Sequence, residues 1–134
     1  MRKKYKWVDA EIKEIKDINT KNPKRLKKML SDYEKQGWTD MDTWSLDCTF
    51  AKFMLPRLKR FKEIKNGYPS NIDDNPAGGY SKKAESIWNK IVDEMIEGFQ
   101  LMADGKQFGG NDVQFKKMNR SLDLFREHFF SLWW

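Results

Sequence analysis

The sequence is poor in the side chains on which metal sites and acid–base catalysis most often depend. It contains one cysteine, Cys48, and one histidine, His128. A single cysteine excludes a disulfide within the chain and a zinc site with several cysteines, and a single histidine leaves no pair for proton transfer. The P-loop, the dinucleotide-binding glycine turn and the HExxH motif are also missing. We therefore expect a protein that is not an enzyme and uses no metal and no cofactor.

Long apolar runs are missing too. No stretch approaches the roughly 20 apolar residues that a bilayer-spanning helix needs, and the start of the chain lacks the apolar core of a signal peptide. These absences predict a soluble, cytoplasmic protein. Nine phenylalanines and six tryptophans in 134 residues argue against disorder, because such rings bury enough surface to offset the entropy of folding.

Apolar residues recur at helical spacing along most of the chain, and no convincing alternation of a β-strand is present. The predicted fold class is mostly α, a compact bundle of about four to five helices. Its central helix is predicted over residues 43–66, where apolar side chains cover most of the circumference and Pro56 bends the helix. Long loops are predicted at 67–80, which contains three glycines and two prolines, and at 105–111, which contains three glycines.

The net charge of +6 is concentrated in the first part of the chain. Residues 1–36 contain 12 Lys and Arg against 6 Asp and Glu. We therefore predict two domains, a basic, variable helical extension over 1–37 and a helical core over 38–134. The basic excess favours phosphate-bearing partners, including nucleic acid, and an ordinary solvated lysine surface explains it equally well.

A second basic cluster follows Pro56 and is the best candidate for a binding site. Arg57, Arg60 and Lys62 offer cations suited to phosphate oxygens, and the arginine fork fits them best. Trp44 or Tyr68 can stack on a nucleobase. This combination predicts a site for an anionic, nucleotide-type ligand, over which the loop 67–80 is expected to close.

Two carboxylates near apolar residues need partners, because an unpaired buried charge is costly. Asp47 is expected either to cap the start of its helix or to contact a ribose or base edge of the ligand. Asp93 is expected to pair with Arg57 or Arg60, or to take part in ligand binding. A metal-dependent hydrolase built on Asp47 and Asp93 is a further alternative, although nothing in their spacing places them together.

The end of the chain favours a different kind of function. Its aromatic residues exceed what one small helix face can bury, and surplus aromatic surface is typical of protein interfaces. They predict either a protein–protein inhibitor or a homo-oligomer that assembles through this aromatic tail. The residues concerned are Phe129, Phe130, Trp133 and Trp134.

Three strings together resemble a widespread family of small bacteriophage and prophage proteins of unknown function. They are WSLDCTFAKFMLPRLKRFKEIKNGYP, the pattern W-x-x-I-x-D-x-M-I-x-x-F over residues 88–99, and the ending LDLFREHFFSLWW. The resemblance covers roughly residues 38–134. It implies a phage origin and a product that acts in the cytoplasm of the infected bacterium, and it supplies no catalytic residues.

Together these observations favour a non-enzymatic phage accessory protein. By analogy with other small phage proteins, we expect it to counter host defence by binding and sequestering a nucleotide-type immune signal. The alternatives are a protein–protein inhibitor of a host defence complex and a nucleic-acid-binding phage protein.

Overall fold

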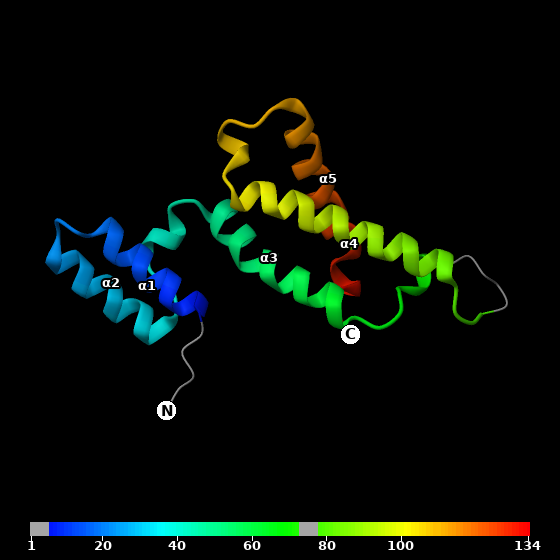
Figure 1. The fold of residues 1–134 in the computed structure, drawn as a ribbon, viewed down its shortest axis with the longest axis horizontal. Helices are drawn as coiled ribbons and strands as arrows, with labels where there is room; N and C mark the ends of the chain where they lie inside the picture. The colour runs from blue at the N-terminus through cyan, green and yellow to red at the C-terminus, as the bar shows by residue number, and fades with distance from the viewer. Residues whose placement is uncertain (1–5, 73–77) are drawn as a thin grey trace. The chain divides into compact units, whose positions relative to one another are not determined.

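The computed structural model describes residues 6–72 and 78–134 (Figure 1). Within these ranges it contains five α-helices and no strand, which confirms the predicted mostly α fold class. The contacts divide the chain into two compact units, Met1–Ser45 and Leu46–Trp134. The boundary predicted from composition lies earlier, after residue 37.

The first unit is a helical hairpin followed by a short 3-10 turn. Asn22 caps the second helix by accepting a hydrogen bond from the Arg25 N–H at 3.1 Å, and Pro23 occupies the first helical position, where its missing N–H costs nothing. Gly37 ends that helix in the left-handed conformation, with φ of 79°. The elements are α1 (Lys6–Ile18), α2 (Pro23–Gln36) and η1 (Asp40–Thr43).

A small core holds this hairpin together. Ile15, Met29 and Tyr33 are buried, and Met41 of η1 packs against them, which is why the segment after α2 belongs to the first unit. Burial, and then the carboxylate of Glu11, raise the pKa of Tyr33 above its usual range. The first unit is therefore stabilised by its own apolar contacts.

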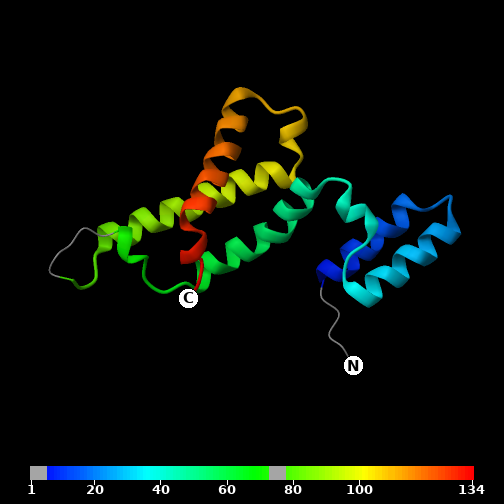
Figure 2. The same ribbon diagram turned by 180° about the vertical axis from the view of Figure 1, so that it is seen from behind.

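The second unit is built on one helix that contacts two others. α4 packs along α3 and is crossed by α5 at a steep angle, as the front and back views show (Figures 1 and 2). The central helix of this unit is therefore α4, and the prediction that the 43–66 helix is central was wrong in this respect. The elements are α3 (Leu46–Ile64), η2 (Ser70–Ile72), α4 (Lys82–Ala103), η3 (Lys106–Phe108), α5 (Asp112–His128) and η4 (Phe129–Ser131).

More residues are buried on α4 than on α3 or α5. Ser81 caps its start by accepting a hydrogen bond from the Ala84 N–H at 3.2 Å. Phe50 of α3 joins the three helices, since its ring contacts Phe99 of α4 and Phe125 of α5. The residues of α4 that are buried are Ala84, Trp88, Val92, Met95, Gly98, Phe99 and Met102.

α3 contains Pro56 and nevertheless runs unbroken to Ile64. Proline has no N–H to donate to the carbonyl four residues earlier, so the helix loses one backbone hydrogen bond at this point. Beside the proline, the Arg57 guanidinium donates to the Phe53 carbonyl at 2.7 Å and lies over the Phe53 ring, 3.6 Å from its centroid. Arg57 thus supports the turn that Pro56 weakens, while the predicted bend stays a prediction.

The two predicted loops each contain a short 3-10 helix. η2 lies within 67–80, and η3 lies within 105–111. Residues 73–77 of the first loop lie outside the described residues, and the predicted closure of that loop over a ligand falls partly on them.

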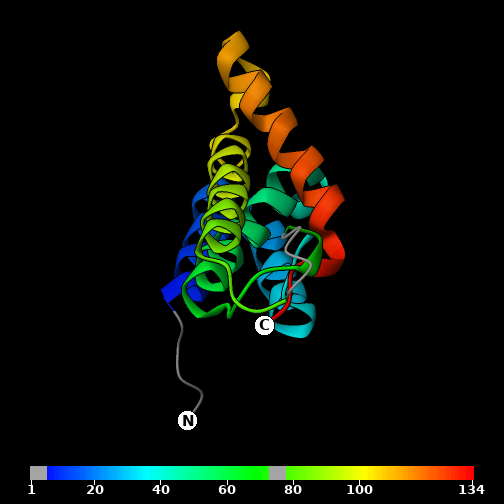
Figure 3. The ribbon, with the colours of Figure 1, turned by 90° about the vertical axis from the view of Figure 1, so that its right-hand side faces the viewer.

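α4 and α5 pack closely against each other at Gly98 and Ser121. Seen along α4, α5 leans away from it toward its own C-terminal end (Figure 3). A side chain at Gly98 would overlap the Ser121 side chain and lie 2.8 Å from the Lys117 carbonyl oxygen. The helix crossing therefore requires glycine at position 98 because there is no space for a Cβ atom.

We expect Gly98→Ala to destabilise the second unit. Alanine favours a helix over glycine by about 1 kcal/mol, but overpacking a core costs about 1–3 kcal/mol. Because the Lys117 backbone cannot move as a side chain can, the cost should outweigh the gain and lower Tm by several degrees in thermal unfolding. Gly109→Ala is the control, because no atom lies within 4 Å of its added Cβ and its φ of 179° suits any residue. A Tm of Gly98→Ala equal to or higher than that of the unaltered protein would contradict this packing.

Candidate ligand-binding site

A cavity of about 350 Å³ lies at the end of the second unit where α3 stops. Three segments far apart in the sequence form it: the turn after α3, the first part of α4 and the end of the chain. This arrangement exists only in the folded unit. The residues that line it are Lys65, Asn66, Gly67, Tyr68, Pro69, Ser70, Asn71, Trp88, Ser131 and Trp133.

The wall of the cavity is a turn held by Gly67 and Tyr68. Gly67 has a φ of 69°, a conformation that side chains disfavour, although a Cβ there would meet nothing within 4 Å. The Tyr68 hydroxyl donates to the Gly79 carbonyl at 3.3 Å and accepts from the Ser81 N–H at 2.7 Å. Tyr68 therefore ties the start of the connection to its end, just before α4.

The floor of the cavity is Trp88, whose side chain is almost fully buried. Its ring makes edge contacts with Phe61 of α3, at 6.4 Å between centroids, and with His128, at 5.3 Å. His128 is itself buried, and its Nδ1 has no hydrogen-bond partner among the described residues. At the rim, Trp133 is 75% exposed. The cavity thus combines a rigid aromatic floor with an accessible aromatic rim.

Among the residues that the structure describes, the charge of the cavity lining has one sign. Lys65 is the only charged residue of this set, which includes no carboxylate, cysteine or histidine. Asn66, Ser70, Asn71 and Ser131 add neutral donors and acceptors. The lining can attract an anion, form hydrogen bonds and stack on a planar ring, but it holds no nucleophile with an adjacent base.

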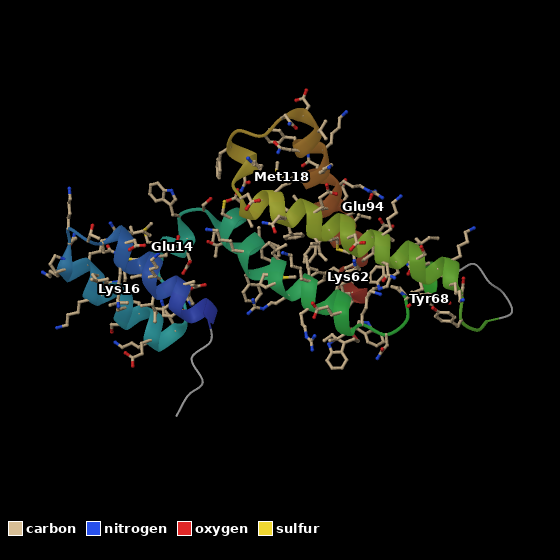
Figure 4. The ribbon with its side chains drawn as sticks, in the orientation of Figure 1. Glu14, Lys16, Lys62, Tyr68, Glu94 and Met118 are labelled. Carbon is tan, nitrogen blue, oxygen red and sulfur yellow. The ribbon has the colours of Figure 1, made fainter. Side chains whose placement is uncertain are left out.

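Of the predicted site residues, Tyr68 lines this cavity, and Lys62 and Asp93 line a second one. That second, more open cavity of about 470 Å³ lies between α3 and α4. Lys62 Nζ and Asp93 Oδ1 form an ion pair at 2.5 Å across the two helices; Figure 4 shows Lys62 on the side of α3 that faces α4 and Tyr68 near the start of α4. The predicted pairing of Asp93 with Arg57 or Arg60 was therefore wrong.

Arg57 and Arg60 line neither of these two cavities. Arg57 is engaged with Phe53, as described above, and Arg60 forms an exposed ion pair with Glu63 at 2.8 Å. Residues three or four positions apart are neighbours on any helix, so such a pair needs no contact with another helix. The three predicted cations thus have three different partners, and their joint role in phosphate binding stays a prediction.

Asp47 lies in the first turn of α3. The Gln107 side-chain amide donates to its carboxylate at 2.9 Å and also contacts the Cys48 sulfur at 3.0 Å. These contacts fasten η3 to the start of α3, which is a structural use of Asp47. Trp44 belongs to the first unit and is 87% exposed, and its predicted stacking role stays a prediction.

The basic residues of α2 are mostly exposed, as a nucleic-acid surface would require. Lys28 is partly engaged, because it donates to Asp32 at 2.9 Å and lies 3.7 Å from Asp40. A hydrogen bond with Asp32, and then the charges of Asp32 and Asp40, raise the pKa of Lys28. Nucleic-acid binding by this unit stays a prediction.

The sequence did not single out Lys65, Trp88 and Trp133 as parts of one site. Lys65 lies in the basic cluster after Pro56 but was not among its predicted ligand contacts, and Trp133 was predicted only as part of the aromatic tail. No local spacing connects positions 65–71 with 131–133. The asparagine and tyrosine that follow Lys65 are the local signal of a binding surface, and such combinations are common.

Comparisons of the chain with protein-family models, with curated proteins and with solved structures found no match. In the part of the chain that the structure describes, no group of three or more His, Cys, Asp or Glu side chains is arranged to hold a metal ion. No helix in those ranges is long and apolar enough to cross a bilayer. The function must therefore be argued from the site itself.

We expect Asp93→Asn to change stability by less than about 1 kcal/mol, because the Lys62–Asp93 pair is about half exposed. Glu97→Gln is the matched variant, since Glu97 also lies on α4 and pairs with Lys117 at 2.5 Å with similar exposure. Chemical unfolding at low and high salt should show small effects for both variants, and smaller ones at high salt. If Asp93→Asn alone lowered the free energy of unfolding by more than about 2 kcal/mol, the Lys62–Asp93 pair would have to be desolvated in solution.

Proposed function

We propose that the protein is a non-catalytic binding protein whose cavity around Lys65 holds a small anionic ligand with a planar ring, of the nucleotide type. The observation that carries this proposal is the lining, whose described residues include one cation and no acid beside Tyr68, Trp88 and Trp133. A volume of about 350 Å³ lies at the lower end of the usual range for small-molecule sites, roughly 300–1,000 Å³.

Each part of the lining has a role in this proposal. The Lys65 ammonium attracts a phosphate group, and a lysine acts there as a point charge rather than a fork. Trp133, exposed at the rim, stacks on the base, a contact worth about 1–3 kcal/mol. Asn66, Asn71 and Ser131 hydrogen-bond the base edge or the sugar.

Binding without turnover fits a protein that sequesters a signal. The resemblance to small bacteriophage proteins supports a role during infection, in the cytoplasm of the bacterial host. We therefore propose that the ligand is a nucleotide-type defence signal and that the protein lowers its free concentration. This step rests on analogy between small phage proteins and not on the fold.

Calorimetric titration of the full chain with a panel of cyclic and linear nucleotides tests the proposal. We expect binding by at least one nucleotide, weakened about tenfold or more by Lys65→Gln, because a charge-assisted contact contributes about 1.5–3 kcal/mol. Trp133→Ala should weaken binding by a similar factor. Chromatography of the bound nucleotide should recover it unchanged.

Lys106→Gln is the control, because Lys106 lies in η3 and does not line the cavity. It should bind like the unaltered protein at the same ionic strength. If no nucleotide gave a heat of binding, the proposal would be contradicted. An unchanged affinity in both Lys65→Gln and Trp133→Ala would contradict it as well. Recovery of a hydrolysed nucleotide would show that the protein is an enzyme.

A further inference from the structure

α3 and α5 each carry two apolar stripes, an inner one that is buried against α4 and an outer one that is largely exposed, although Phe50 of the outer stripe also contacts Phe99 of α4. The inner stripe of α3 includes Ala51 and Leu58, and that of α5 includes Met118 and Leu124; all four are buried. The outer stripes are unusual, because a surface helix normally turns polar residues to solvent.

The outer stripe of α3 consists of Leu46, Phe50 and Phe53. Their spacing of four and then three residues places them on one side of the helix. All three are exposed, and the Arg57 guanidinium covers part of Phe53. Arginine and aromatic residues together are typical of protein interfaces.

The outer stripe of α5 consists of Phe115 and Leu122, and it continues to Phe129 in η4. These residues recur every seven positions, the spacing by which one helix packs along another. All three are exposed to solvent, by 39% to 53%.

Ring contacts join the two stripes into one surface. Phe50 of α3 meets Phe125 of α5 at 5.8 Å between centroids, and Phe125 meets Phe129 at 5.3 Å. Phe129 in turn meets Phe130, which is 90% exposed, at 5.5 Å. We call this surface the aromatic face; its exposed members are Leu46, Phe50, Phe53, Phe115, Leu122, Phe129 and Phe130.

The area of the aromatic face approaches that of a stable interface. A phenylalanine side chain presents about 200 Å² when fully exposed. With exposures between 39% and 90%, the phenylalanines of the face present on the order of 500 Å², before the two leucines are counted. A standard interface buries about 800 Å² on each partner, and about 500 Å² already lies in the upper part of the range of the largest apolar patches on monomers, roughly 300–600 Å², which are often functional.

We propose that the aromatic face is the interface of a homodimer, in which a second copy of this chain covers it. This inference is independent of the proposed ligand site, because no member of the face lines the cavity around Lys65.

The chemistry of the face favours a second copy as its partner. A two-fold dimer places the same patch on both sides, so an aromatic surface meets one of equal apolarity and size. The stripes of α3 and α5 on one copy then pack as helices on those of the other. Charge opposes this association only weakly, because residues 46–134 contain 14 Lys and Arg against 12 Asp and Glu, a net of +2.

Sedimentation or light scattering of the full chain tests the dimer. We expect a mass of twice 16.0 kDa at tens of micromolar, falling toward the monomer on dilution. Phe130→Glu should weaken the dimer about tenfold or more, because it places a charge in the apolar interface. Phe130 suits this test, since its high exposure makes it dispensable for folding. Phe53→Glu should have the same effect from α3, with helical content checked by circular dichroism.

Phe108→Glu is the matched control, because Phe108 of η3 is also highly exposed and is not a member of the aromatic face. It should leave the dimer intact. A monomer mass up to about 100 μM would overturn the proposal and leave the face to a different partner protein. A dimer that Phe130→Glu and Phe53→Glu do not weaken would overturn it as well, because the interface would then lie elsewhere.

Discussion

The burial of Trp88 is the interaction on which the second unit and its candidate site both depend. Its ring meets Phe61 of α3 and His128 at the end of α5, so it joins the three helices at one end of the unit. The same ring forms the floor of the cavity around Lys65. Because an indole buries a large area and has a fixed shape, it sets both the spacing of the helices and the depth of the cavity.

The last residues of the chain are close neighbours in sequence but contribute to two different surfaces. Phe129 and Phe130 belong to the aromatic face, while Ser131 and Trp133 line the cavity. The 3-10 turn η4 makes this possible, because it changes the direction of the chain directly after α5. In the proposed functions, Phe129 and Phe130 contact a second copy of the chain, and Ser131 and Trp133 contact a ligand.

The structure also explains why the candidate site could be only partly predicted. Tyr68 was predicted because an aromatic ring close in sequence to the basic cluster can stack on a nucleobase, which is a local signal. Asp93 was predicted to pair with an arginine, yet its partner is Lys62, because the relative rotation of α3 and α4 decides which cation faces it. Lys65 and Trp133 were not connected, since their nearness depends on how α5 crosses α4 at Gly98 and Ser121.

By itself the sequence determined the helical fold class, the helix caps at Asn22 and Ser81, and the excess of aromatic side chains. These properties depend on interactions within a few residues along the chain, such as periodicity, capping and turn chemistry. Only the tertiary structure decided that α4 is the central helix, that Lys62 pairs with Asp93, and that three distant segments enclose a cavity. Those outcomes depend on packing between helices, where the steric fit at a few contacts selects one crossing that no local pattern records.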